Sequence, residues 1–302
     1  MAWGLFKKLV VADRLAVFVG AVFAQPAQAT GGRALAAIVF FTVQLYADFS
    51  GYSDLAIGSA QVLGFNLADN FNRPFSARSL GEFWQRWHIS LSTWLRHYLF
   101  LPVSYTVLRI SKKEKWGPCR ATAWAYGAAV MLTITVCGLW HGPRWTFVFW
   151  GALHGFFLLL SFATRRWRKR MRKRIFGQRQ ALIAFIQRLM TFSLFTGLFV
   201  FFRSGTLEKA FTLFGRLGSG WSQDISMIWQ TLKAGRPDQE MIIALSAVAA
   251  IIVFHFLVRH DRMRGMLEGT SWVWRWLFYV ALVLSILNLW WVDPVPFIYS
   301  QF

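Results

Sequence analysis

The chain of 302 residues is 56% hydrophobic and 18% aromatic, and only 15% of its residues are charged. A soluble globular domain carries about 25% charged residues, so this composition excludes that class and indicates a membrane protein. The net charge of +20 does not indicate a nucleic-acid partner, because the basic residues gather at the ends of apolar segments, as orientation signals do.

Apolar segments long enough to cross a bilayer, which takes about 20 residues, recur along the chain. Their length favours α-helices over barrel strands, which alternate over about ten residues. Residues 3–23 are a weaker candidate because they include Lys7, Lys8, Asp13 and Arg14. The stronger candidates are Ala34–Leu63, Ala121–Trp140, Trp145–Ala163, Ala181–Phe202, Met241–Val258 and Trp272–Trp291. The sequence therefore predicts an all-α, polytopic transmembrane bundle of six or seven spans, forming a single domain over residues 1–302.

Clusters of basic residues predict the orientation of these spans. Short loops rich in Lys and Arg stay on the cytoplasmic side. This places the loops Arg109–Arg120, Arg165–Arg179 and Arg259–Arg264 inside, with two spans between each and the next. Eight of the ten residues in 165–174 are basic, and this run can also touch anionic lipid headgroups. The stretch Ser204–Glu240 is then expected outside.

The first strong span contains a polar segment, Tyr46–Gly58. It includes Asp48, Ser50 and Asp54, which become candidates for substrate binding because an intramembrane carboxylate usually lines a cavity or pairs. Asp48 and Asp54 are six residues apart and point in different directions on a helix, which disfavours a shared carboxylate dyad. The structural alternative is helix packing with interhelical hydrogen bonds.

Residues 80–99 have helical periodicity and predict an amphipathic helix at the interface or lining a cavity. Trp87 and His88 lie on its apolar face, and His97 lies on its polar face. We expect His97 to be a solvated residue. For His88 the sequence leaves two alternatives open, a functional imidazole or one bonded within the core.

The segment Gly138–Trp145 places His141 between two apolar segments, Ala121–Cys137 and Thr146–Phe162. Ionisable residues are costly in a bilayer, so such a position favours a functional role. The alternative is a histidine that only bonds a neighbouring helix. His154 lies between two glycines, in Gly151–Gly155, and this spacing of small residues favours close helix packing over a contact with substrate.

The motifs of several enzyme classes are missing. The sequence contains no Gly-x-Ser-x-Gly elbow, P-loop or His-Glu-x-x-His, which disfavours serine hydrolysis, nucleotide hydrolysis and zinc catalysis. A neutral imidazole can still take a proton from a hydroxyl that attacks an activated acyl carbonyl. Apolar surroundings would exclude the water that hydrolyses the acyl donor.

Six motifs occur in an order that resembles the membrane-bound O-acyltransferase (MBOAT) family. The branch that it is most similar to contains the bacterial alginate and peptidoglycan O-acetyltransferases. The motifs are Trp-Gly-Leu-Phe-Lys-Lys at 3–8, Tyr46–Gly58, Asn72–Phe75, Phe83–Ser92, Gly138–Gly142 and Trp150–Gly155. Family members carry several further spans before the first motif, so this chain is expected to lack them.

The resemblance implies a multi-pass enzyme of the bacterial inner membrane that moves an acyl group, here acetyl, onto a hydroxyl of an exported polysaccharide such as alginate. It implies that His141 is the general base and that His88 orients substrate or donor. Trp87 and Trp140, which adjoin these histidines, are further candidates for substrate binding. No bound cofactor or metal is expected.

The expected acyl donor is acetyl-CoA or another thioester on the cytoplasmic side, because the basic flanks of the 80–99 segment suit an anionic donor. In this branch, a periplasmic partner of the Ser-His-Asp (SGNH) esterase type and a polymer-synthesis complex often complete the process. Two alternatives remain open, an inactive scaffold within such a complex and a transporter that relays protons through Asp and His. A transporter would require internal repeats, and we find none.

Overall fold

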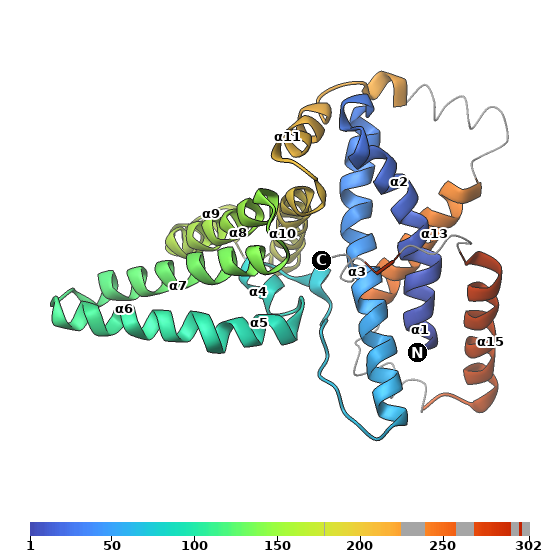
Figure 1. Cartoon of the computed structure of the whole chain (residues 1–302), viewed down its shortest axis with the longest axis horizontal. Helices are drawn as coiled ribbons and strands as arrows, with labels where there is room; N and C mark the ends of the chain where they lie inside the picture. Colours follow the sequence, from blue (N-terminus) through green and yellow to red (C-terminus); the bar gives the residue numbers. More distant parts are fainter. Residues whose placement is uncertain (178, 225–238, 258–268, 291–295, 298–302) are drawn as a thin grey trace. The chain divides into compact units, whose positions relative to one another are not determined.

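A computed structural model describes residues 1–177, 179–224, 239–257, 269–290 and 296–297 (Figure 1). The described residues are mainly helical, as the all-α prediction requires. They form two compact units, one of residues 1–73 with 203–302 and one of residues 74–202. Each unit is described by itself.

The first unit is built around the long helix α3 (Gly31–Val62). The segment before it is a nearly continuous helix, and it packs along α3 through α1 (Ala2–Leu5), a π-helical segment (Phe6–Ala12) and α2 (Asp13–Ala24). The weaker span predicted at 3–23 is therefore helical. The later helices of this unit are α11 (Leu207–Arg216), α13 (Gln239–Leu257) and α15 (Trp272–Leu289).

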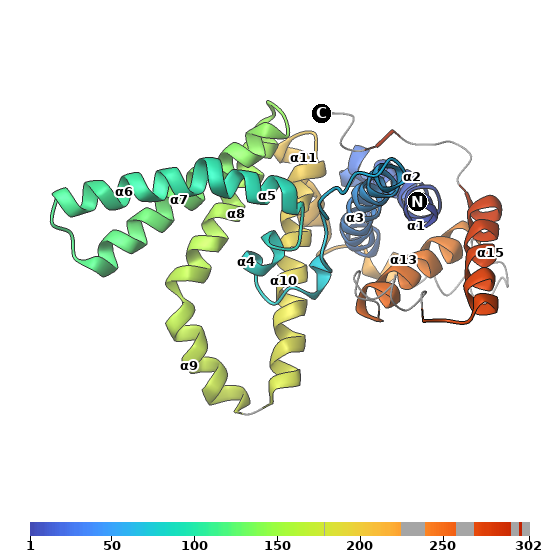
Figure 2. The same cartoon turned by 90° about the horizontal axis from the view of Figure 1, so that it is seen from below.

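The second unit contains the histidines that the sequence singled out. Its helices are α4 (Leu80–Trp84), α5 (Ile89–Leu95), a π-helical segment (Arg96–Phe100), α6 (Leu101–Lys113), α7 (Pro118–Trp140), α8 (Trp145–Ala163), α9 (Arg165–Phe176) and α10 (Gln180–Arg203). Within this unit, α6 and α7 lie side by side, and α9 continues from α8 (Figure 2).

Five described helices are long and apolar enough to cross a membrane: α3, α7, α8, α10 and α15. They confirm five of the six stronger predicted spans. The sixth prediction, Met241–Val258, corresponds to α13, which contains the shorter apolar stretch Ile242–Val253. Val258 and Trp291, the ends of two predicted spans, and the loop Arg259–Arg264 lie outside the described residues.

Helices α7 and α8 form a tight hairpin because glycine allows their backbones to approach. A Cβ added at Gly138 would lie nearer than 3.0 Å to the carbonyl oxygen of Phe147, and one at Gly151 would meet that of Ile134 as closely. A Cβ at Gly155 would lie 2.8 Å from the sulfur of Met131. The packing role predicted for the small residues around His154 is confirmed.

The prediction of one continuous amphipathic helix over residues 80–99 is wrong, although the segment is largely helical. Helix α4 ends at Trp84, and α5 begins at Ile89 after a turn. The break occurs at His88, whose backbone is left-handed with φ 45° and ψ 55°. A residue in this conformation cannot continue a right-handed helix, so the predicted faces are not continuous across the segment.

The basic segment Arg165–Arg179, expected as a loop, is largely helical, with α9 over Arg165–Phe176. Arg168 holds its first turn by donating hydrogen bonds to the hydroxyls of Ser161 and Thr164, at 2.8 and 3.1 Å. These bonds satisfy oxygens at the end of α8 and anchor the first turn of α9 to it.

Candidate active site

His141 occupies the turn that joins α7 to α8. Its backbone N–H donates to the carbonyl of Gly138 at 3.1 Å, and the chain then reverses through Gly142, whose φ of 144° requires a glycine. The imidazole is 4% exposed. Its ring centroid lies 5.6 Å from that of Trp150 and 4.9 Å from that of Phe202. The turn therefore holds a buried histidine among aromatic rings.

His88 is brought to the same region by the turn between α4 and α5. It is 9% exposed, and its ring centroid lies 6.2 Å from that of Trp140. Trp140 in turn lies 4.9 Å from His141, so its indole contacts both imidazoles. The structure thus brings together His88, Trp140 and His141, which are three of the predicted site residues.

Burial controls the protonation of both histidines. Desolvation lowers the pKa of His88 to about 4. Desolvation is also the main cause that lowers the pKa of His141 to about 3, and the neighbouring His88 lowers it further. Both imidazoles are therefore neutral near pH 7, the form in which an imidazole accepts a proton.

His154 and Trp87 occupy packed positions. His154 is fully buried, and its ring lies 4.7 Å from Trp150 and 5.3 Å from Trp84. Neither of its ring nitrogens has a hydrogen-bond partner among the described residues. Trp87 is 3% exposed and stacks on Phe83 at 5.4 Å. Their parts in substrate binding stay predictions.

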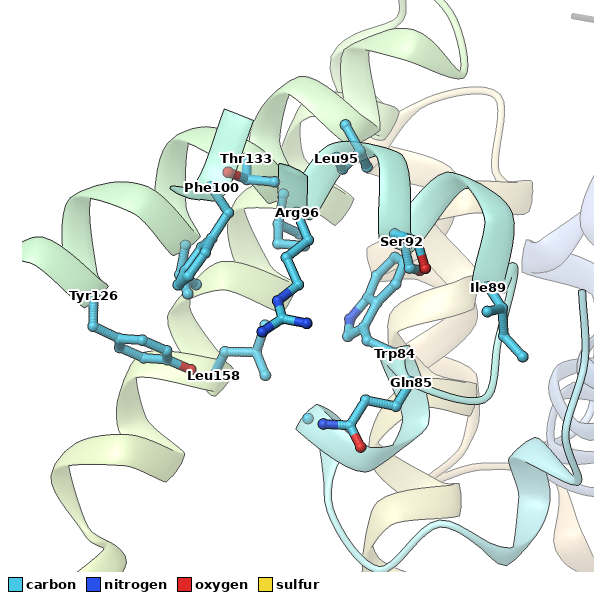
Figure 3. Close-up of a pocket in the computed structure, with 14 residues that line it drawn as sticks. Trp84, Gln85, Ile89, Ser92, Leu95, Arg96, Phe100, Tyr126, Thr133 and Leu158 are labelled. Atoms are coloured by element: carbon cyan, nitrogen blue, oxygen red, sulfur yellow. The ribbon is translucent and has the colours of Figure 1, made fainter. Parts of the chain in front are cut away.

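A cavity of about 370 Å³ opens between α4, α5, the π-helical segment, α7 and α8. Its lining is mainly apolar, and Figure 3 shows the guanidinium of Arg96 projecting between Trp84 and Tyr126. The indole N–H of Trp84 and the hydroxyl of Thr133 are buried in this wall without a hydrogen-bond partner in the described structure. The cavity therefore offers a guanidinium cation and at least two donors that lack a partner in the described structure to a ligand.

The cavity wall is connected to His141 by aromatic contacts. Trp84 lines the cavity and lies 5.9 Å from Trp150, which contacts His141. Sequence reasoning missed the roles of Trp84, Trp150 and Arg96. Both tryptophans lie in motifs of the family resemblance, which was the available signal. Periodicity placed Arg96 on the polar face of the 80–99 segment, but it did not single Arg96 out among the other polar residues of that face.

The acidic candidates belong to the first unit, where they pair with lysines. Lys8 Nζ lies 2.7 Å from Asp48 Oδ1 and 2.8 Å from Asp13 Oδ1. Lys7 Nζ lies 3.0 Å from Asp54 Oδ2. These contacts give Asp48 and Asp54 different lysine partners, in agreement with the expectation that they form no dyad.

Ser50 joins the same network, because its Oγ accepts a hydrogen bond of 2.8 Å from Lys7 Nζ. The carboxylates of α3 thus pair with the lysines of the preceding helical segment, and Ser50 adds a neutral hydrogen-bond acceptor. Their predicted part in substrate binding stays a prediction. Among the described residues, no three His, Cys, Asp or Glu side chains gather closely enough to hold a metal ion.

Comparison with known proteins agrees with this architecture. Residues 3–204 match the model of the membrane-bound O-acyltransferase family, MBOAT. In an alignment of 314 positions, gaps included, which covers 99% of this chain, it is 33% identical to a probable alginate O-acetylase of Pseudomonas putida. It is 44% identical to the corresponding protein of Azotobacter vinelandii over 54% of the chain.

A third relative is named for a different acceptor. The chain is 36% identical, over 68% of its length, to a peptidoglycan O-acetyltransferase of Helicobacter pylori. It covers 30% of the Azotobacter protein, 59% of the Pseudomonas protein and 36% of the Helicobacter protein. The chain thus spans about a third to three fifths of the length of these relatives.

Proposed function

The chain belongs to the membrane-bound O-acyltransferase family, and from this premise we propose that it transfers an acetyl group to a hydroxyl of an exported polysaccharide. Its spans would lie in the bacterial inner membrane. The observation that carries the proposal is the burial of two neutral histidines around Trp140, one of them in the turn of a helical hairpin. The names of the relatives support acetyl as the acyl group and alginate as one candidate acceptor.

His141 would act as the general base. A nitrogen of its neutral imidazole would accept the proton of the acceptor hydroxyl as the hydroxyl oxygen attacks the acyl carbonyl. The carbon–sulfur bond of a thioester donor would then break, and the departing thiolate would take the proton from the imidazolium. The aromatic rings around His141 would keep water from the acyl carbonyl.

His88 would position the donor or the acceptor. Trp140 links it to His141, because the indole ring contacts both imidazoles. Because burial keeps His88 neutral, it can donate one hydrogen bond and accept another. A neutral donor of this kind would orient a hydroxyl or carbonyl without adding a charge.

The cavity beside α4 and α5 suits the acyl donor. A thioester such as acetyl-CoA combines an anionic end with an extended chain, and the cavity combines the Arg96 guanidinium with an apolar lining. Guanidinium groups bind phosphates with two parallel hydrogen bonds. We expect Arg96→Gln to raise the KM for the donor about tenfold while changing kcat less.

Further partners follow from the same proposal. The chain contains no nucleophile elbow. In one form of the proposal, the acceptor hydroxyl at His141 would belong to a periplasmic enzyme of the SGNH type, which would then pass the acetyl group to the polymer within or beside a polymer-synthesis complex. Co-purification of this chain with such an enzyme from native membranes would test the division of labour.

The deciding experiment compares His141→Ala with His97→Ala in native membranes. Both membranes receive labelled acetyl donor and polysaccharide, and His97 is a suitable control because its side chain is exposed. We expect His141→Ala to lose at least about a hundredfold in acetylation and His97→Ala to retain it. Equal acetylation by both variants would exclude His141 as the base. Absence of acetylation in the parent membranes, despite folded protein, would favour a scaffold or a transporter.

A further inference from the structure

Helix α9 carries two different surfaces along its length. Eight of the ten residues in 165–174 are basic. Trp167, Met171 and Ile175 recur at intervals of four and therefore share one side of the helix. Arg166 and Lys169 lie on the opposite side. This pattern is typical of a helix that lies in the membrane interface.

The apolar stripe of α9, formed by Trp167, Met171 and Ile175, is largely uncovered. Trp167 is 62% exposed and Ile175 is 60% exposed. Figure 2 shows α9 continuing from α8 at the edge of its unit. Because α8 is apolar enough to cross a membrane, this continuation starts α9 near the end of a span.

Arg168 fixes the start of α9 relative to α8. Its guanidinium donates to the Ser161 hydroxyl at 2.8 Å, to the Ser161 carbonyl and to the Thr164 hydroxyl at 3.1 Å. These bonds join the last turn of α8 to the first turn of α9. The orientation of the apolar stripe is therefore set by the span and does not depend on a free hinge.

We propose that α9 is an interfacial helix that binds anionic phospholipids at the cytoplasmic surface. Its apolar stripe inserts among the acyl chains, and its basic side chains contact the headgroup phosphates. A bilayer matches both surfaces at once, because anionic headgroups attract Lys and Arg while the hydrocarbon boundary buries Trp and Ile. A nucleic acid would neutralise the charges but leave the apolar stripe in water, which makes it the poorer match. This inference goes beyond acyl transfer and does not depend on it.

The test measures the depth of single side chains in the full chain. Cys119 and Cys137 are first replaced by alanine. Single cysteines at 167, 171 and 175, or at 166 and 169 as the matched control, are then labelled with a nitroxide. The protein is reconstituted in nanodiscs of phosphatidylcholine alone or with about 30% phosphatidylglycerol. Collision with oxygen and with a water-soluble nickel complex reports the depth of each label.

In the anionic discs, we expect the ratio of oxygen to nickel accessibility to be at least about threefold higher at 167, 171 and 175 than at 166 and 169. The difference should shrink in phosphatidylcholine discs. It should also shrink in Arg165→Gln/Arg170→Gln/Arg172→Gln, which retains Arg168 and its contacts and leaves positions 166 and 169 for the control labels. Because this variant leaves the apolar stripe unchanged, it tests the role of the charges even if a nitroxide label disturbs the stripe.

Three results would overturn the proposal. One is equal water accessibility of all five labels in anionic discs. Another is equal insertion with and without phosphatidylglycerol, which would remove the requirement for anionic lipid. The third is protection of the labels only when RNA or another protein is added.

Discussion

Lys8 and Asp48 form a buried ion pair in which the ammonium nitrogen lies 2.7 Å from a carboxylate oxygen, and both side chains are at most 7% exposed. The same ammonium lies 2.8 Å from Asp13. The pair joins the motif at 3–8 to the motif at 46–58, two segments that the sequence presents as separate. It explains how a charged segment can lie against α3 in an apolar unit, because its buried charges have oppositely charged partners within the fold.

Replacing Lys8 by methionine should destabilise the first unit strongly. Methionine keeps roughly the length of the side chain but removes the ammonium that contacts Asp48 and Asp13. Loss of one partner of a buried ion pair lowers the free energy of unfolding by about 3–5 kcal/mol. We expect the apparent melting temperature in detergent to fall by about 10 °C or more. Fluorescence-detected size-exclusion chromatography after heating measures this value.

Arg86→Gln is the matched control for Lys8→Met. Arg86 also forms an ion pair, with Glu82 at 2.7 Å, but both side chains are 29% exposed. A partly exposed pair at this spacing contributes only about 0.3–0.5 kcal/mol. Equal shifts in the two variants would contradict the assignment of a structural role to the buried network.

Alanine at Gly138 should disrupt the hairpin that presents His141. The added Cβ would meet the carbonyl of Phe147, which belongs to the backbone of α8 and cannot move alone. We expect a loss of both thermal stability and acetylation. Gly127→Ala, in the same helix α7, is the control, because its Cβ would lie 3.6 Å from Leu159 Cδ2, an ordinary contact. Normal activity and stability of Gly138→Ala would show that the helices can separate without harm.

Substitutions at His88 should separate its backbone role from its side-chain role. Asparagine and glycine tolerate the left-handed conformation at φ 45°, whereas alanine is strained there. We expect His88→Asn and His88→Gly to keep a melting temperature near that of the parent and His88→Ala to lower it. All three should lose acetylation if the imidazole positions substrate. Full activity of His88→Asn would limit the residue to its structural role.

Stability should fall as the pH is lowered from 6.5 to 4.5. Histidines in the unfolded chain take up protons near pH 6.5, whereas burial holds the pKa of His88 at about 4 and that of His141 at about 3. In this window the unfolded state binds more protons than the folded state, so acid favours unfolding.

Melting temperatures measured across this pH window test the linkage. The slope should be shallower in His141→Gln than in the parent. His97→Gln changes an exposed side chain and should leave the slope unchanged. An identical slope in the parent and in His141→Gln would show that His141 already takes up its proton in the folded state.

The sequence by itself predicted the membrane class, five helices long and apolar enough to span a bilayer, and close helix packing around His154. These features depend on residues near one another in the chain: an apolar run is long enough to span, and glycines four apart share one helix side. The position of His141 between two spans followed from the same local reading. Its enclosure by Trp150 and Phe202 did not, because these rings come from α8 and α10.

Only the tertiary structure decided the partners of the polar residues. Lys7 pairs with Asp54 and Lys8 with Asp48, residues that lie forty or more positions further along the chain. Composition and local pattern do not predict such pairings. Sequence periodicity did not predict the helix break at His88, because the helical pattern continues on both sides of it. The left-handed backbone of His88 lies beside the buried side chains of Phe83 and Trp87, and such packing is not visible in a local pattern. Local physics placed the helices, and contacts between distant residues determined which side chains meet.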